Sequence, residues 1–192
     1  LLEEPPKNTI FLLISHQPNL LLPTLKSRCQ KLSFSNLDKT DLGAVLSAIG
    51  CKIEPSEEVS LSILSKGSAG AACKYINANC INLYRDILNL ASSLPNLNTN
   101  KISQLSQNYF AKAKPSEFVI FLEMMQHFFS RLCKTGVMQT PILPSVTDNE
   151  AKIMKSLCPN LKSARLWSEA ANITLAKLNK GYRLNIDIES LI

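Results

Sequence analysis

The 192-residue sequence has few glycines, few aromatic residues and no long hydrophobic run. No apolar stretch approaches the roughly 18 residues that a membrane-spanning helix needs. Six glycines and ten prolines are too few for a collagen-like or low-complexity chain. An apolar content of 45% is too high for a disordered chain. We therefore expect a folded cytoplasmic protein that has no membrane contact.

Residue patterns for catalysis and metal binding are also scarce. The two histidines, His16 and His127, are far apart, and neither has a cysteine or carboxylate at metal-ligand spacing. The sequence contains no C-x-x-C pair, no phosphate loop of the form G-x-x-x-x-G-K-[ST], no G-x-G-x-x-G and no G-x-S-x-G. We therefore expect no metal, no cofactor and no enzymatic activity from this chain alone.

The cysteines do not form a recognisable framework. Cys73 and Cys80 are seven residues apart and could share one helix face, but buried free thiols are the simpler interpretation, which we favour. Without a secretory signal, a disulfide framework is not expected. The six cysteines are Cys29, Cys51, Cys73, Cys80, Cys133 and Cys158.

The first 34 residues contain two candidate strands. Residues 9–15 form a continuous apolar run with β-branched residues, typical of a strand buried on both faces of a parallel sheet. Residues 30–34 are a second candidate, and two strands make a poor sheet by themselves. The start at Leu1, without Met or a signal peptide, leads us to expect a fragment of a longer polypeptide.

From Leu37 onward the pattern is helical. We expect a helix capped by Asp38 and ended by Gly50, a second from Ser56 to Lys66, a third over residues 69–77 capped by Ser68, and a longer one over 79–94. The polar, turn-rich residues 92–100 are the predicted linker.

The second half also predicts helices throughout. An amphipathic helix begins at Ser116 and is expected to end at Gly136, and the spacing of Thr147 and Glu150 predicts a capping box. A further helix should end at Gly181, and Asn185 could cap a last piece. Net charge is concentrated here, at +5 for residues 95–192, against +2 for residues 1–34 and −1 for residues 35–94.

One string of residues near the N-terminus is long and distinctive enough that it is not expected by chance. It begins with Leu-Glu-Glu-Pro-Pro at 2–6, continues through the apolar run 8–15 and Pro18, and ends with Leu-Lys-Ser-Arg-Cys at 25–29. This string resembles the sensor-1 strand and Ser-Arg-Cys motif of clamp-loader ATPases of the AAA+ family. The resemblance spans the whole chain, strongly to about residue 80 and weakly beyond.

The family resemblance implies a mainly α fold in three parts. Residues 1–36 would be the end of an α/β AAA+ core with one or two strands, residues 37–94 a three-helix lid, and residues 95–192 an all-helical collar that oligomerises the loader. The family's phosphate loop and zinc module would then lie outside this sequence. Without them, we expect residues 1–34 to be mobile, rearranged or supported by a neighbouring molecule.

Two departures from ATP-hydrolysing members imply a non-motor subunit. Their sensor-2 motif reads G-S-x-R, whereas this chain has Gly67, Ser68, Ala69 and Gly70. Their sensor-1 turn often reads Thr-Thr-Asp-Pro, whereas this chain has Ser15-His16-Gln17-Pro18. Both sensor regions are therefore interpreted as degenerate.

The resemblance also assigns a role to Arg28, which would be an arginine finger that reaches the ATP of a neighbouring subunit. A guanidinium is permanently charged and can fork across phosphate oxygens. Ser27 and Cys29 would support the motif by packing and positioning. Without the surrounding motif, a surface salt bridge is the ordinary interpretation of Arg28.

The implied protein is an accessory subunit of a DNA-directed DNA polymerase holoenzyme that helps to load the sliding clamp. Its partners would be the gamma/tau and delta subunits of the loader, through the collar and the Ser-Arg-Cys face, with primer-template DNA and the clamp contacted indirectly. Two alternatives stay open. One is an ATP-hydrolysing gamma/tau-type loader subunit, and the other is an unrelated helical nucleic-acid-binding module, suggested by the basic second half.

Overall fold

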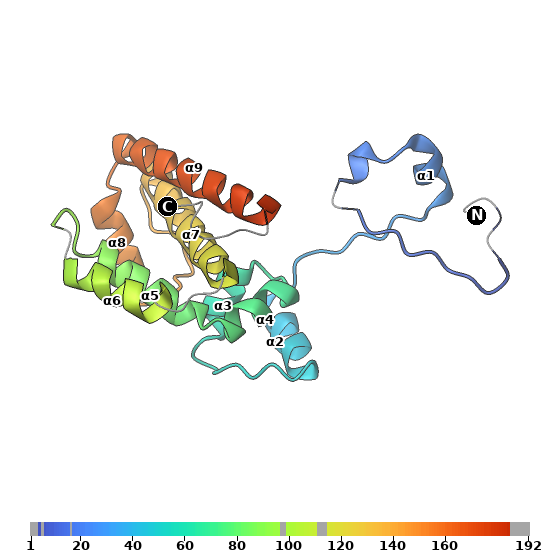
Figure 1. Cartoon of the computed structure of the whole chain (residues 1–192), viewed down its shortest axis with the longest axis horizontal. Coiled ribbons are helices and arrows are strands. Elements are labelled where there is room, and N and C mark those ends of the chain that lie inside the picture. The colour runs from blue at the N-terminus through green and yellow to red at the C-terminus, as the bar shows by residue number, and fades with distance from the viewer. Residues whose placement is uncertain (1–3, 5, 16, 97–98, 111–114, 185–192) are drawn as a thin grey trace. The chain divides into compact units, whose positions relative to one another are not determined.

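A computed structural model describes residues 4, 6–15, 17–96, 99–110 and 115–184 (Figure 1). The chain divides into two compact units, Leu1–Ser35 and Asn36–Ile192. The described residues are helical or irregular and contain no strand. Within them, no helix combines the length and the apolar character that crossing a membrane requires.

The first unit contains two short helices, η1 (Pro18–Leu20) and α1 (Pro23–Arg28). The predicted strands at 9–15 and 30–34 are wrong for the described residues, which have no regular secondary structure there. Ile10, Leu12 and Ile14 are 86%, 86% and 89% exposed. A strand needs neighbouring strands for its N–H and C=O groups, and the first unit supplies none in its described part.

The second unit begins with α2 (Lys39–Ala48), α3 (Glu58–Ser65), α4 (Ala69–Asn77) and α5 (Cys80–Ala91). Two predicted N-caps are confirmed. The Asp38 carboxylate accepts a hydrogen bond from the Asp41 N–H at 2.8 Å, and the Ser68 hydroxyl accepts one from the Ala71 N–H at 3.3 Å. Side-chain acceptors satisfy N–H groups that have no partner inside the helix.

The predicted break between the helices over 69–77 and 79–94 is confirmed, and both Cys73 and Cys80 are free thiols, the interpretation that we favoured. Asn79 has a left-handed backbone with a φ of 51°, so the helical path is interrupted there. Cys73 lies in α4 and Cys80 is the first residue of α5. The two cysteines therefore do not share a helix face, because they belong to different helices.

The unit continues with α6 (Thr99–Phe110), α7 (Pro115–Met138), α8 (Glu150–Leu157) and α9 (Leu161–Leu184). Helix α7 does not end at Gly136, and α9 extends past Gly181. A Cβ at Gly136 would collide with the Cys158 Sγ, so this glycine permits close packing inside the helix and does not terminate it. The predicted cap at Asn185 lies outside the described residues.

One hydrophobic core runs through the second unit, with buried residues from Leu42 in α2 to Ala164 in α9. Helices α7 and α9 lie side by side (Figure 1). Buried residues on both sides of the predicted boundary at residue 94 belong to the same cluster. The division into lid and collar at that position stays a prediction.

A buried ion pair joins α7 to α8 within this core. Arg131 donates from Nε to the Glu150 Oε1 at 2.7 Å and from Nη2 to the Glu150 Oε2 at 3.1 Å. Glu150 is 1% exposed and also accepts from the Tyr84 hydroxyl at 2.7 Å and the Val146 N–H at 2.6 Å. Burial is the main cause that raises the pKa of Tyr84, so its hydroxyl stays a neutral donor.

The capping box predicted at Thr147 and Glu150 is wrong. Helix α8 begins at Glu150 itself, with Asn149 at the N-cap position. In a capping box the Glu150 carboxylate would accept a hydrogen bond from the Thr147 N–H, but here it accepts one from the Val146 N–H. The half-buried Arg131 binds this carboxylate in the core, and a local sequence rule cannot anticipate that contact.

Candidate functional site: the Ser-Arg-Cys segment and the turn between α3 and α4

Helix α1 positions the Ser-Arg-Cys segment. Pro23 occupies its first turn, where a missing N–H costs nothing. The Ser27 Oγ and the Arg28 Nη1 both donate to the Thr24 carbonyl oxygen, at 3.1 Å and 3.0 Å. Arg28 is the last residue of α1 and is exposed. The helix therefore ends with an accessible guanidinium, while Ser27 bonds to the helix backbone.

The other predicted residues of the first unit lie in short local structures. Cys29 follows α1 directly, as an exposed free thiol. The Ser15 hydroxyl accepts a hydrogen bond from the Gln17 N–H at 3.2 Å. His16 lies outside the described residues. The Ser15 contact is a local backbone turn of a kind common for serine, and by itself indicates no chemistry.

Gly67 has a structural reason to be glycine. Its φ is +73°, and a Cβ there would lie 2.8 Å from the backbone nitrogen of Leu37, inside the range that real contacts avoid. The Leu37 N–H donates to the Gly67 carbonyl oxygen at 3.0 Å. This residue therefore lets the segment before α2 pass against the turn between α3 and α4.

Ser68 and Gly70, the two other residues predicted to form a degenerate sensor-2 region, differ in their surroundings. Ser68 serves as the N-cap of α4. Gly70, in the first turn of α4, is exposed, and a Cβ there would meet nothing within 4 Å. The space around Gly70 would accept a longer side chain, so packing does not require a glycine there.

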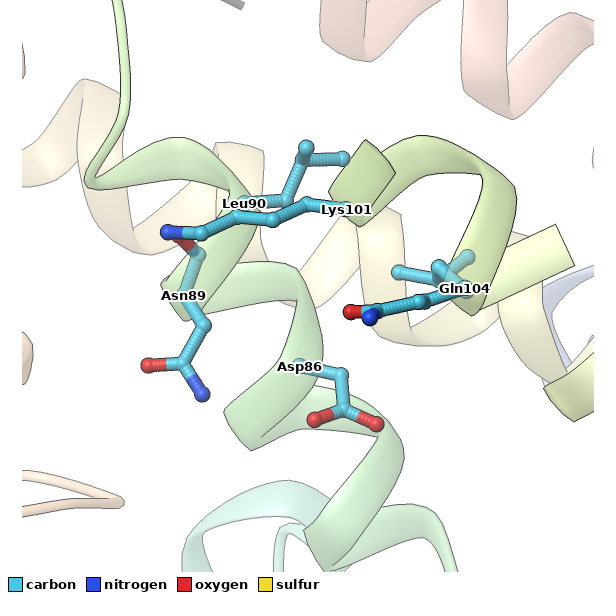
Figure 2. A pocket seen from close by; sticks show the side chains of 6 residues that line it. Asp86, Asn89, Leu90, Lys101 and Gln104 are labelled. Carbon is cyan, nitrogen blue, oxygen red and sulfur yellow. The ribbon is translucent and has the colours of Figure 1, made fainter. Parts of the chain in front are cut away.

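A cavity of about 230 Å³ lies between α5 and α6 (Figure 2). Asp86, Asn89 and Gln104 contribute polar groups to its lining. The Asp86 Oδ2 accepts from the Tyr109 hydroxyl at 2.9 Å, and the Lys101 Nζ donates to the Asn89 carbonyl oxygen at 3.0 Å. These bonds tie α6 to α5, and the lining contains none of the residues that the sequence predicts for function.

His127 is a half-buried residue of α7. Its ring packs edge-on against the Tyr75 ring, with 6.3 Å between the ring centroids. Burial, followed by the charges of Lys66 and Arg131, lowers the pKa of His127 to about 4. The imidazole is therefore neutral at physiological pH. In the described part of the chain, no three His, Cys, Asp or Glu residues form a group that could hold a metal ion.

Two cysteines that no sequence pattern links lie close together in the second unit. The Sγ atoms of Cys51 and Cys73 lie 3.0 Å apart, and both cysteines are free and half-buried. The two residues are 22 positions apart, and all of α3 lies between them. No spacing rule for short motifs covers such a pair, because only the packing of α2 and α4 brings it together.

Comparison with known proteins connects the start of the chain to a replication family. A family described as DNA polymerase III, delta subunit, matches residues 1–38. A 28-residue segment is 71% identical to DNA polymerase III subunit delta′ of Pseudomonas aeruginosa. That segment covers 15% of this chain and 8% of the Pseudomonas protein. No solved structure matches the chain. The two sequence matches support the family that the motif analysis predicts.

Proposed function

We propose that this chain belongs to a delta′-type subunit of bacterial DNA polymerase III, an accessory subunit that helps to load the sliding clamp onto primed DNA. The observation that carries the proposal is the 71% identity to a delta′ subunit over 28 residues. The match to the delta family over residues 1–38 supports it, because that range includes Ser27, Arg28 and Cys29.

Arg28 is the residue proposed to act, as an arginine finger on the ATP of a neighbouring subunit. Its exposure at the end of α1 supports the proposal, because such a finger must project from the surface of its own subunit. The developing charge on a transferring phosphoryl group is stabilised by a positioned guanidinium. The bond from Ser27 to Thr24 holds the end of α1 together and gives Ser27 a positioning role.

The subunit is proposed to be a non-motor member of the loader. Gly70 supports this, because it stands where ATP-hydrolysing members carry the sensor-2 arginine and its surroundings leave room for a side chain. ATP would be bound by the neighbouring gamma/tau subunit. The second unit would form the lid and collar that hold the subunit among its gamma/tau and delta partners, with DNA and clamp contacted indirectly.

The test is Arg28→Ala in a clamp loader reconstituted with this subunit. ATP hydrolysis stimulated by DNA and clamp should fall at least about tenfold, since arginine fingers in related chemistry contribute 10³ or more. Arg28→Lys should restore little of the lost ATP hydrolysis, because an ammonium group cannot make the paired hydrogen bonds to two phosphate oxygens that a guanidinium makes.

Lys26→Ala is the matched control. Lys26 is an exposed cation of the same helix, and its Nζ bonds to the Asn19 carbonyl oxygen at 3.1 Å. This variant should keep the wild-type rate. Undiminished hydrolysis with Arg28→Ala in a fully assembled loader would refute the finger. Failure of the wild-type subunit to enter the loader, measured by gel filtration, would refute the delta′ assignment itself.

A further inference from the structure

Cys51 and Cys73 are held close together by two well-defined pieces of backbone. The Cys51 N–H donates to the Leu46 carbonyl oxygen at 2.9 Å, and the Gly50 N–H donates to the Ser47 carbonyl oxygen at 3.1 Å. With the φ of +78° at Gly50, these bonds form a Schellman motif that ends α2. Cys51 is the residue after the glycine of this motif, so its backbone position is defined by hydrogen bonds.

The second thiol is placed by a helix. Cys73 lies inside α4, whose N-terminus is capped by Ser68. The two Sγ atoms are 3.0 Å apart, and a disulfide bond needs about 2.05 Å. Closing the remaining gap of about 1 Å requires only rotations of the two side chains about χ1.

We propose that Cys51 and Cys73 are a redox-active pair, a site of reversible disulfide formation that clamps the end of α2 to α4 when a peroxide oxidises it. This inference concerns the second unit and does not depend on the proposed function.

The separation of the two sulfurs favours a disulfide over a metal site. Tetrahedral zinc with Zn–S bonds near 2.3 Å would hold two sulfurs about 3.8 Å apart. The observed 3.0 Å is shorter. A structural zinc site also needs four ligands, and the described residues contain no group of three or more metal-binding side chains.

The chemistry balances in two steps. The thiolate of one cysteine attacks a peroxide oxygen, which gives a sulfenic acid and, from hydrogen peroxide, one water. The second thiol attacks that sulfur, the S–S bond forms, and a second water leaves. The two thiols lose two electrons, and the peroxide gains them. Both side chains are half-buried, so a small oxidant can reach them.

The two thiols act as a coupled pair. The hydrogen bond with Cys51 is the main cause that raises the pKa of Cys73, followed by burial. Either thiol can make the first attack, and the other then acts as the resolving thiol.

The first experiment maps disulfides in the wild-type chain. The reduced protein is treated with hydrogen peroxide, the remaining thiols are alkylated, and tryptic peptides are analysed by mass spectrometry. Each of the six cysteines falls in a separate tryptic peptide, so every linkage has its own mass. The expected product joins peptide 40–52 to peptide 67–74 in a monomeric chain and disappears after treatment with dithiothreitol.

The second experiment measures the melting temperature before and after oxidation. A disulfide between α2 and α4 should raise it by roughly 5 to 10 °C. Cys51→Ser and Cys73→Ser should abolish the shift, whereas the control Cys133→Ser should keep it. Full alkylation of both Cys51 and Cys73 after peroxide treatment would overturn the proposal. A link from Cys73 to any other cysteine would overturn it as well. The peptide map decides the question even if a serine variant fails to fold.

Discussion

Replacing Glu150 with alanine should destabilise the whole second unit. The Glu150 carboxylate is 1% exposed and binds Arg131 through two hydrogen bonds, at 2.7 Å and 3.1 Å. It also accepts hydrogen bonds from the Tyr84 hydroxyl at 2.7 Å and from the Val146 N–H at 2.6 Å. The network therefore joins α5, α7 and α8 through a single side chain.

The cost follows from what the substitution leaves behind. Arg131 is 11% exposed at its side chain and would lose its carboxylate partner. Breaking a buried ion pair by removing one partner costs about 3–5 kcal/mol. The same change leaves the Tyr84 hydroxyl and the Val146 N–H without their acceptor. We expect a loss of about 4 kcal/mol, a large part of the roughly 5–15 kcal/mol that stabilises a typical domain.

Urea unfolding followed by circular dichroism measures this loss. Glu150→Gln should cost less, about 2 kcal/mol, because the amide keeps an acceptor oxygen and the shape of the side chain. The matched control is Glu58→Gln, which removes an exposed pair with Lys39 at 3.3 Å and should cost under about 1 kcal/mol. If Glu150→Ala costs no more than this control, the network does not stabilise the fold.

The same unfolding curves test whether the second unit folds as one body. Tyr84 precedes the predicted boundary at residue 94, while Arg131 and Glu150 follow it. If residues 37–94 and 95–192 share one cooperative core, Glu150→Ala should shift a single transition. Two separate transitions, with only one shifted, would instead show that the lid and collar unfold independently.

Two further predictions concern Gly67 and His127. Gly67→Ala should lower the free energy of urea unfolding by about 2 kcal/mol or more, because Gly67 has a φ of +73° and a Cβ there would meet the Leu37 backbone. Gly70→Ala should leave this free energy unchanged or raise it by up to about 1 kcal/mol, because a Cβ at Gly70 meets no neighbour. Equal effects of the two alanines would contradict this account of the turn. Because the folded pKa of His127, about 4, lies below the unfolded value of 6.5, the unfolded state binds more protons between these pH values, and stability falls as pH falls. The wild type should lose about 2 to 3 kcal/mol relative to His127→Gln between pH 7 and pH 4.5, and a constant difference would refute the burial argument.

Local chemistry explains which structural predictions succeeded. Asp38 and Ser68 were recognisable as helix caps because a short side chain bonds to an N–H three residues away, and both bonds are present. The same kind of rule failed at Thr147 and Glu150. There the carboxylate had a stronger competing partner, Arg131, which is 19 residues distant and invisible to a local pattern.

Glycines show the same limit. Gly50 ends α2 with a φ of +78°, as predicted, because the Schellman motif is made by neighbouring residues. Gly136 was predicted to end α7, yet it lies inside the helix against the Cys158 Sγ. A glycine that terminates a helix and one that admits a neighbouring helix cannot be told apart until the neighbour is known.

The proposed site divides in a similar way. The string around Ser27, Arg28 and Cys29 was informative because its residue types and spacing are specific, and the family match covers it. The predicted strand at 9–15 depends on partner strands, and the described residues of the first unit provide none. Apolar residues indicate that a segment can be buried, and only its neighbours determine whether it is.

The sequence by itself predicted most of the helices that the structure describes from residue 39 onward and two of the helix caps, and its first 38 residues match a replication family. These features depend on local periodicity, short-range hydrogen bonds or a contiguous motif. Only the tertiary structure decided the buried pair of Arg131 and Glu150, the approach of Cys51 to Cys73 and the position of Gly136. Each of these depends on which helices pack together, and that choice is made by the free energy of the whole core.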